Sequence, residues 1–474
     1  MNLKDSASAA RPLREAFERQ RHARHSTSTP TYRERIAALA ALESMLRSAT
    51  PELCDAVDAD FQGRAAEETR LLEIFPALEG ARHARRHLRR WMRPQRRATS
   101  VWFLPGRSRV MFQPLGVVGI VVPWNYPIYL AAAPIVSALS AGNRILVKMS
   151  EAAPRTGELF AALVARHFDP ARLSVVNGGP DLAREFVSLP FDHLLFTGST
   201  AVGRDVMRAA AENLTPVTLE LGGKSPAIVG RDIDIAQAAG KIMYGKCLNA
   251  GQTCIAPDYA LVPEERIEDF VAAARASVER MYPQLAKNAQ YSSIVNARHR
   301  ERLASLLDEA RRAGTRIEEV NPGGGDMSGS PKVAPQLLVS ADPGLRVMRE
   351  EIFGPLLPIV GYGDAADAIA YVNARPRPLA LYVFDHNEQT IARVLDETVS
   401  GGATVNETIL HIAQDDLPFG GVGPSGMGEY HGRAGFETFS KRKAVFRQSR
   451  LNLLGLFRPP YGPRFERLMR LLSR

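Results

Sequence analysis

The chain has 474 residues, of which 45% are hydrophobic and 23% charged, so it can bury a large core, and wholesale disorder is excluded. Lys and Arg outnumber Asp and Glu by 60 to 51, a modest excess for this length that would suit an anionic partner. Three cysteines are too few for a disulfide framework and form no Cys/His cluster with zinc spacing. We therefore expect no metal site and a reducing compartment.

The N-terminal region predicts helices. Residues 1–28 are polar, and we expect them to be loosely ordered at the start. Thr31 and Glu34 form a capping-box sequence at the start of a helical region that ends near Pro94. The N-terminus lacks the apolar core of a secretory signal, and no apolar stretch reaches the ~20 residues that cross a membrane. These features predict a cytoplasmic protein without a membrane span.

From residue 113 onward, short apolar runs alternate with longer amphipathic ones. The runs that we interpret as buried strands are 116–122, 144–148, 173–176 and 193–196. A second stretch of this kind begins near Val217, with helices predicted near 234–246 and 264–280. The alternation predicts an α/β fold with parallel sheets and right-handed crossovers. Since no repeat or low-complexity linker separates the two stretches, we expect them to pack intimately.

Cys254 is a candidate nucleophile. It follows Gly251-Gln-Thr, a turn-rich segment that lets backbone N–H groups approach the sulfur. Such donors would lower the pKa of the thiol and would stabilise an oxyanion on an attacked carbon. A buried structural cysteine is the competing interpretation, because free cysteine is among the most buried residue types. For Cys247, on a predicted helix, we prefer that structural role to a redox role.

Two further polar residues could support such a nucleophile. Glu220 lies between two leucines, where burial would raise its pKa toward the range of a general base. The alternative for Glu220 is a salt bridge to Lys224. Asn125 directly follows a predicted strand, so its amide could donate to a developing oxyanion, although a simple turn asparagine is the alternative.

Two strand ends offer groups that could bind a nucleotide. The turn at 196–203 leads from a strand into a helix, and its glycines and Ser199 could hold a pyrophosphate at the helix N-terminus. That turn contains neither GxGxxG nor a P-loop. Lys148 and Glu151 end another strand and could bind ribose hydroxyls, or they could form a solvated surface pair.

In this order, the motifs resemble the aldehyde dehydrogenase superfamily over about residues 30–447. The motifs are Pro-Trp-Asn-Tyr-Pro at 123–127, Phe-Thr-Gly-Ser at 196–199, Leu-Glu-Leu-Gly-Gly-Lys at 219–224, Gly-Gln-Thr-Cys at 251–254 and Glu-Glu-Ile-Phe-Gly-Pro at 350–355. The stretch 417–428, with Tyr-His-Gly at 430–432 and Phe-Ser-Lys at 439–441, looks like the class-three branch. Residues 414–419 and 350–358 look most like the bacterial coniferyl aldehyde dehydrogenases.

The resemblance implies NAD as coenzyme, with NADP possible, and a cysteine mechanism. Cys254 would attack the aldehyde, Asn125 would hold the oxyanion, and Glu220 would activate the water that hydrolyses the thioester. By the same analogy, the coenzyme-binding residues are Lys148, Glu151, Gly198, Ser199, Gly203, Glu351 and Phe353. The residues that match positions lining the substrate tunnel are Tyr126, Tyr244, Ile409, Ala413 and Phe419. An aromatic wall suits an aromatic aldehyde such as coniferyl aldehyde, and long aliphatic aldehydes are the alternative.

The resemblance also implies two Rossmann-like parallel-sheet domains and a β oligomerisation arm. The expected parts are an NAD-binding domain of 1–92 and 113–219, a catalytic domain of 220–405, an arm of 93–112 and 406–450, and a C-terminal tail of 451–474. Arms that add strands to a partner's sheet would leave exposed edges in a free monomer, so we expect a homodimer.

Three alternatives compete with parts of this interpretation. A relative that acylates coenzyme A would gain nothing from Glu220 as a water activator. The arginines between 82 and 97 could bind nucleic acid, but Ala84, Leu88 and Trp91 recur at helical spacing and favour a helix with one packed face, so we expect no nucleic-acid partner. The basic tail could lie on a membrane, but docking onto the body or onto a partner subunit is the preferred interpretation.

Overall fold

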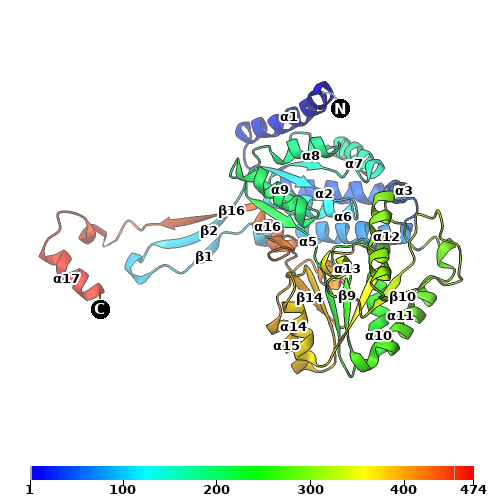
Figure 1. Ribbon diagram of the computed structural model, residues 1–474. Coiled ribbons are helices and arrows are strands. Elements are labelled where there is room, and N and C mark those ends of the chain that lie inside the picture. Colours follow the sequence, from blue (N-terminus) through cyan, green and yellow to red (C-terminus); the bar gives the residue numbers. More distant parts are fainter. Residues whose placement is uncertain (1–2, 453, 474) are drawn as a thin grey trace.

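Two sheets of mostly parallel strands form the centre of the molecule, and a narrow antiparallel sheet extends away from them (Figure 1). The computed structural model describes residues 3–452 and 454–473. Within these residues, the six-stranded sheet has the order β15-β7-β6-β3-β4-β5, the seven-stranded sheet β10-β11-β12-β9-β8-β13-β14, and the three-stranded sheet β1-β2-β16. The predicted α/β class with parallel sheets is confirmed.

The six-stranded sheet contains the four strands predicted from the first apolar runs. Its strands are β3 (Val117–Val121), β4 (Arg144–Lys148), β5 (Leu173–Val176), β6 (His193–Thr197), β7 (Val217–Glu220) and β15 (Gly426–Met427), of which β15 alone pairs in antiparallel. The helices packed around it are α6 (Tyr129–Ala141), α7 (Pro154–His167), α8 (Pro180–Val187) and α9 (Thr200–Ala211). Val121 pairs with Lys148 and Phe196, and Thr197 pairs with Glu220. The carboxyl ends of these strands therefore meet at one edge, which is where α/β proteins bind ligands.

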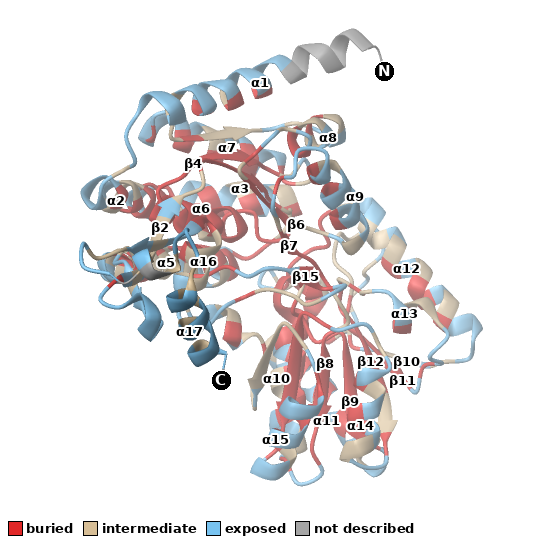
Figure 2. Ribbon diagram, turned by 90° about the vertical axis from the view of Figure 1, so that its left-hand side faces the viewer, coloured by how far each residue is buried: buried red, intermediate tan, exposed pale blue. Residues whose placement is uncertain are grey.

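The seven-stranded sheet follows in sequence and lies below the first in Figure 1. Its strands are β8 (Pro226–Val229), β9 (Tyr259–Pro263), β10 (Arg316–Glu319), β11 (Gln336–Val339), β12 (Leu356–Tyr362), β13 (Ala380–Phe384) and β14 (Gly402–Val405), with β10 antiparallel. Its helices are α10 (Ile235–Cys247), α11 (Ile267–Met281), α12 (Ala297–Arg312), α13 (Arg346–Arg349), α14 (Ala365–Asn373) and α15 (Glu388–Glu397). The inner strands of both sheets are buried between helices (Figure 2), whereas the edge strands β5, β10, β14 and β15 are partly exposed.

Helices form the N-terminal region, as predicted, but they begin earlier than expected. They are α1 (Leu3–Ser26), α2 (Tyr32–Ser48), α3 (Thr50–Phe61), α4 (Ala66–Thr69), a π-helical turn η1 (Arg70–Ile74) and α5 (Phe75–Trp91). The capping box of Thr31 and Glu34 is present. The expectation of a loosely ordered start is wrong from residue 3 onward, and residues 1–2 lie outside the description. Leu13, Phe17 and Gln20 lie on one face of α1, and their burial against the six-stranded sheet stabilises the helix.

The arginine-rich helix α5 has the packed face that its pattern predicts. Ala84, Leu88 and Trp91 are buried. On the other face, Arg82 and Arg85 bind the carboxylate of Glu43. The arginine run is therefore the solvated face of a packed helix.

The three-stranded sheet consists of β1 (Gln95–Arg97), β2 (Arg107–Pro114) and β16 (Ser440–Arg447), and it projects from the body (Figure 1). A 3-10 turn, η2 (Val101–Phe103), lies at its turn. Between β14 and β16, the chain passes from the seven-stranded sheet to the six-stranded sheet through η6 (Leu410–Ala413), β15 and α16 (Gly432–Thr438). The structure describes no helix that is long and apolar enough to cross a membrane.

The C-terminal tail continues beyond β16 through η7 (Leu454–Phe457) to α17 (Pro463–Leu472). It lies on the side of the arm, away from both parallel sheets (Figure 1), and no described residue of α17 is buried. The expectation that the tail docks onto the body is therefore wrong for a single chain, because β16 directs the tail outward, where the ring of Phe465 packs on that of nearby Tyr461. Docking onto a partner subunit stays a prediction.

Candidate functional site

Cys254 lies between the seven-stranded sheet and the loop that follows β3. It comes after α10 and a tight turn, η3 (Leu248–Gly251), in which Asn249 and Ala250 have φ values of 49° and 50°. This left-handed backbone costs energy in residues other than glycine, so the surroundings must hold it in place. The strained turn ends three residues before the sulfur-bearing residue.

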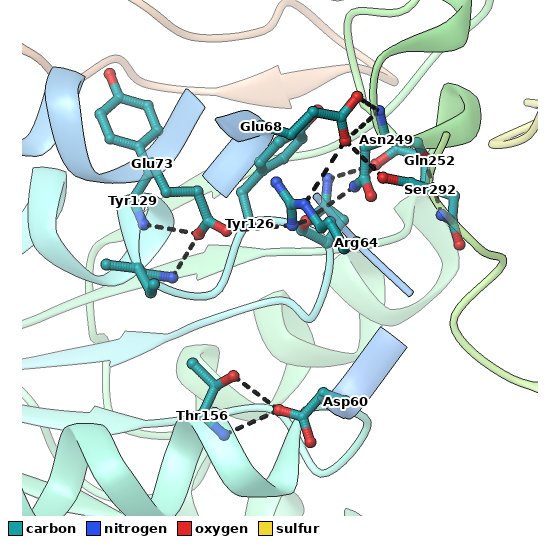
Figure 3. A network of polar contacts seen from close by, with 12 residues as sticks. Asp60, Arg64, Glu68, Glu73, Tyr126, Tyr129, Thr156, Asn249, Gln252 and Ser292 are labelled. Carbon is teal, nitrogen blue, oxygen red and sulfur yellow. Dashed lines mark hydrogen bonds and ion pairs between the residues drawn. The ribbon is translucent and has the colours of Figure 1, made fainter. Parts of the chain in front are cut away.

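The amide groups of Asn249 and Gln252 hold the loop of residues 248–254, which carries the candidate nucleophile and is named the catalytic loop (Figure 3). Gln252 donates from Nε2 to the carbonyls of Asn249 at 2.8 Å and Ser293 at 2.9 Å, and its Oε1 accepts from the Val295 N–H at 3.0 Å. Asn249 donates from Nδ2 to the carbonyl of Asn125 at 3.0 Å. The catalytic loop is therefore fixed to the strand end that carries Asn125.

A buried ion-pair network lies beneath the catalytic loop (Figure 3). The guanidinium of Arg64 is fully buried, donates to the carbonyl of Asn125 at 2.9 Å and lies 3.1 Å from Oε1 of Glu73. Glu73 accepts from two N–H groups at the start of α6, and Glu68 accepts from the Asn249 N–H at 3.1 Å and the Ser292 hydroxyl at 2.6 Å. Burial raises the pKa of both carboxyls, although Arg64 opposes the shift.

This network was not expected from the sequence. Arginine and glutamate are mostly surface residues, so Arg64, Glu68 and Glu73 carried no signal of burial. The only available hint was the spacing of Arg64 and Glu68 by four residues, which is common on exposed helices.

Glu220 ends β7 and is buried with neither carboxylate oxygen hydrogen-bonded within the described residues. Burial, with a smaller contribution from the charge of Glu429, raises its pKa well above the ordinary value, as the sequence predicted. The alternative salt bridge is wrong, because Lys224 instead donates to Asp258 and to the carbonyl of Val347 at 2.8 Å.

The thiol of Cys254 departs from expectation. Burial and the nearby charges of Glu351 and Glu220 raise its pKa to about 12. The N–H groups of Cys254 and Ile255 do lower the pKa, as predicted, but desolvation and two carboxylates outweigh them. The prediction of a lowered pKa is therefore wrong for the chain alone. The same charges place Cys254, Glu220 and Glu351 in one cluster.

Asn125 is buried, and its side-chain amide donates to the carbonyl of Gln252 at 3.1 Å. The hydroxyl of the neighbouring Tyr126 forms a hydrogen bond with the hydroxyl of Thr253 at 2.6 Å. Both contacts lie within two residues of Cys254, so the loop after β3 and the catalytic loop form one unit. The amide of Asn125 thus lies beside the backbone that carries the sulfur.

Lys148 and Glu151 form an ion pair at the carboxyl end of β4. The Nζ atom of Lys148 lies 2.5 Å from Oε2 of Glu151, and Lys148 is buried while the Glu151 side chain is 47% exposed. Ser199 follows β6, which is separated from β4 by one strand, β3. Its hydroxyl oxygen caps α9 by accepting from the Val202 N–H. Gly203 is buried in the first turn of α9, where a Cβ would contact Leu221 at 2.7 Å.

Glu351 approaches the turn after β7. A Cβ at Gly222 would lie 1.9 Å from its Oε2, so only glycine permits this approach. Burial, followed by the charge of Asp258, raises the pKa of Glu351 to about 8, and Oε1 has no hydrogen-bond partner in the part of the chain that the structure describes. Phe353 packs edge-on against Trp124 at 5.3 Å between ring centroids.

The residues predicted to line a substrate tunnel differ in their surroundings. Tyr126 and Phe419 are buried, and the Phe419 ring stacks on His431 at 5.4 Å and on His411 at 6.0 Å. Ile409 is half-buried, and Tyr244 and Ala413 are exposed. Only Tyr126, of these five residues, has a side-chain hydrogen bond to the catalytic loop among the bonds of the described residues.

Comparison with known proteins adds to this geometry. Residues 4–445 match the model of the aldehyde dehydrogenase family. The chain belongs to that family. It is 49% identical to a "Probable coniferyl aldehyde dehydrogenase" of Pseudomonas aeruginosa, over 98% of this chain and 97% of that one, and 44% identical to the "Coniferyl aldehyde dehydrogenase" of a Pseudomonas species, over 100% and 98%. A solved structure, the substrate-bound state of Staphylococcus aureus AldH, covers 100% of both chains at 35% identity with a TM-score of 0.91.

The chain is thus an aldehyde dehydrogenase, an oxidoreductase of a family that uses NAD(P). The carboxyl edge of the six-stranded sheet fits such a dinucleotide. It offers the capped N-terminus of α9 for a pyrophosphate and the Lys148–Glu151 pair for hydroxyl groups. Near Cys254, Glu351 carries a buried oxygen without a hydrogen-bond partner among the described residues, as a residue that binds a ribose hydroxyl would.

Proposed function

We propose that Cys254, Asn125 and Glu220 catalyse oxidation of an aldehyde to its carboxylate, with water as the final acyl acceptor. The observation that carries this proposal is Glu220: a buried carboxylate without a hydrogen-bond partner among the described residues, with a raised pKa, close enough to Cys254 to shift the pKa of its thiol. Such a group suits a general base, because an elevated pKa gives it the proton affinity to activate water near neutral pH.

The residues divide the chemistry as follows. The thiol of Cys254 loses its proton, and the thiolate adds to the aldehyde carbon, while the oxyanion accepts from the Asn125 amide and the Cys254 N–H. Bound NAD(P) supplies the acceptor for the hydride that leaves this carbon. Glu220 then takes a proton from the water that attacks the thioester, and the thiolate leaves as the carboxylate product forms. Lys148, Glu151, Gly198, Ser199, Gly203, Glu351 and Phe353 would hold the coenzyme.

For the substrate, we propose an aromatic aldehyde of the coniferyl type. Three relatives at 44–49% identity bear that name, two of them with the word "probable", and Phe419 lies in a stack of aromatic rings that could pack on a planar conjugated substrate. Tyr126, Tyr244, Ile409 and Ala413 would complete the wall. An aromatic pair contributes ~0.5 to 1.5 kcal/mol beyond area burial, which is enough for preference over a short aliphatic aldehyde. Long aliphatic aldehydes remain the second candidate, since Ile409 and Ala413 suit an alkyl chain.

For the assembly, we propose a homodimer in which the three-stranded sheet contacts the partner. The support is an arm of three strands that projects from the body and exposes Trp102 and Phe103 at its turn. We further propose that the six-stranded and seven-stranded sheets mark an NAD-binding domain of 1–92 and 113–219 and a catalytic domain of 220–405. Sedimentation at micromolar concentration should show a dimer, and a single monomeric species would contradict this proposal.

Two measurements test the proposed reaction and substrate. Product analysis with and without coenzyme A should give the free acid in both cases, and acyl-CoA as the main product would contradict a hydrolytic role of Glu220. A kcat/KM comparison of coniferyl aldehyde, benzaldehyde, hexanal and a long-chain aldehyde should favour the aromatic substrates. If an aliphatic aldehyde exceeded coniferyl aldehyde by about tenfold, equivalent to ~1.4 kcal/mol in transition-state binding, the aromatic proposal would be wrong.

A further inference from the structure

A second site lies at the amino edge of the six-stranded sheet, opposite the carboxyl edge that the proposed reaction uses. A cavity of about 470 Å³ is bounded there by the segment between α1 and α2, the turn between β2 and β3, and the residues that begin β4 and precede β5 and β6. These segments lie on the side of the molecule that faces the viewer in Figure 2, near the labels α2, β2 and β4. The volume lies within the range of small-molecule pockets.

Cationic side chains dominate the lining of this cavity. They are Arg24, Arg144, Arg172 and Lys441, against the single carboxylate of Asp192. Arg35 adds a further guanidinium close behind the lining, since burial and the nearby charge of Arg172 lower the pKa of Arg35 to about 10. Several positive charges thus share a partly desolvated space, which is unfavourable without a counter-charge.

The acidic groups nearby are already occupied. Asp192 binds Arg24 through both oxygens, at 2.6 and 2.8 Å, and accepts from the Val117 N–H at 2.7 Å. Glu34 accepts from the N–H and the hydroxyl of Thr31 in the capping box, at 2.6 and 2.7 Å. Asp192 is therefore fully engaged, whereas the charge of Glu34 reaches Arg172 and offsets part of the positive charge there. The four cations of the lining still outnumber these two carboxylates.

Arg172 has guanidinium donors without a hydrogen-bond partner among the described residues. Its Nε and Nη2 atoms are buried and have no hydrogen-bond partner among the residues that the structure describes. By contrast, Arg144 donates to the carbonyl of Ala23 at 3.0 Å and the hydroxyl of Thr27 at 2.5 Å, and Arg35 donates to the carbonyls of Pro30 and Ser140 at 3.0 Å. A guanidinium fork matches two oxygens of a phosphate or carboxylate group, and phosphate is recognised particularly well by arginine.

We propose that this cavity binds a phosphate-bearing small molecule, with the guanidinium of Arg172 turning from its half-buried position toward the anion as the anchoring group and Lys441 as a second contact. Ser28 and Thr29 line the same cavity and supply hydroxyl groups for the remaining oxygens. The cavity has room for more than a phosphate ion, so either free phosphate or a phosphate ester could be the source of the anion. Because the site uses none of the proposed catalytic residues, it stands or falls independently of the dehydrogenase reaction.

Isothermal titration of the full-length protein with inorganic phosphate tests the site. The coenzyme site is first saturated with NAD, and ionic strength is held constant with chloride, so that neither the coenzyme's own phosphate subsites nor general screening contributes. We expect saturable phosphate binding in the wild type. In Arg172→Gln the Kd for phosphate should rise by about tenfold or more, since hydrogen bonds between charged groups are lost. The matched control is Arg208→Gln on α9, an exposed arginine outside the cavity, which should bind phosphate as the wild type does.

Thermal unfolding provides a second readout that also reports on folding. Phosphate should raise the Tm of the wild type and of Arg208→Gln but not of Arg172→Gln. Without phosphate, Arg172→Gln should be at least as stable as the wild type, because it removes a crowded positive charge. If Arg172→Gln fails to fold, Lys441→Gln on the exposed face of β16 replaces it and should weaken binding in the same way.

A parallel titration with glycerol 3-phosphate distinguishes the two sources of the anion. Tighter binding than phosphate supports a phosphate ester, and equal binding supports the free ion. The proposal is overturned if the wild type shows no saturable binding, or if Arg172→Gln and Lys441→Gln bind phosphate as tightly as Arg208→Gln does.

Discussion

The buried guanidinium of Arg64 donates to the backbone carbonyl of Asn125 at 2.9 Å, and the side chain of Asn249 donates to the same oxygen at 3.0 Å. One carbonyl thus joins the N-terminal helices, the loop after β3 and the catalytic loop. In the proposed mechanism, Cys254 attacks the carbon of a carbonyl group and Asn125 donates to its oxygen, so the separation of the two side chains is critical and depends on this shared acceptor. Arg64 is therefore a positioning residue in the proposed mechanism.

Arg64→Met is expected to lower both stability and turnover. The substitution leaves the buried carboxyls of Glu68 and Glu73 without their cation, which costs ~3 to 5 kcal/mol for a buried pair. Thermal unfolding measures the loss as a lower Tm. The matched control is Arg208→Met on α9, whose exposed pair with Asp205 should contribute under ~1 kcal/mol.

The double variant Arg64→Met/Glu73→Gln separates charge balance from positioning. Removing both members of the pair should recover part of the lost Tm, because no unpaired charge remains on Glu73. It should not recover kcat, since the hydrogen bond to the Asn125 carbonyl is still absent. Recovery of kcat together with Tm would show that Arg64 acts only through stability.

Glu220→Gln is expected to slow thioester hydrolysis while leaving the first half-reaction intact. The amide cannot accept a proton from water, so the acyl-enzyme should accumulate. Stopped-flow absorbance should then show a burst of NADH equal to the enzyme concentration, followed by a slow steady state. Cys254→Ala serves as the control without any burst, because no acyl-enzyme can form. Equal loss of burst and steady state in Glu220→Gln would show that Glu220 acts before hydride transfer or only structurally.

The raised pKa of Cys254 predicts a pH dependence in the chain without coenzyme. Thiolate is the reactive form, and with a pKa of about 12 its fraction at neutral pH is very small. The rate of Cys254 alkylation by iodoacetamide, followed by peptide mass spectrometry, should therefore rise about tenfold per pH unit from pH 7 to 10. A plateau below pH 9 would contradict the raised pKa. Glu351→Gln should speed alkylation at fixed pH, because it removes a nearby negative charge.

Much of the fold was predictable because the inner strands of the two parallel sheets are nearly all apolar. Buried parallel strands such as β3 and β4 need apolar side chains on both faces, and this requirement leaves continuous runs in the sequence. The helix that begins after Thr31 was equally visible through its capping box. Helix α1 was not, because only a few buried residues, Leu13, Phe17 and Gln20, lie within a long polar stretch.

The candidate site likewise contains residues that were predictable from the sequence and features that were not. Cys254, Glu220 and Asn125 were predictable from motifs, but the thiol pKa depends on how deeply the sulfur is buried and on Glu351, about 100 residues further along the chain. The network around Arg64 was not predictable, since isolated charged residues give no sequence signal for burial. Contacts between residues distant in the chain are what the sequence pattern alone does not specify.

Coenzyme preference is expected to depend on Glu151. Although burial opposes ionisation, the hydrogen bond from Lys148 lowers the pKa of Glu151 below its ordinary value, so its carboxylate is charged at neutral pH. If this carboxylate binds the adenine ribose, the extra phosphate of NADP would meet a like charge beside it, and kcat/KM should favour NAD. Glu151→Gln keeps the shape but removes the charge, so the ratio of kcat/KM for NAD to that for NADP should fall by about tenfold, equivalent to ~1.4 kcal/mol. Glu158→Gln, at an exposed position on the following helix, is the matched control and should leave the ratio unchanged. A wild-type ratio that favours NADP, or one that Glu151→Gln does not alter, would show that this carboxylate does not select the coenzyme.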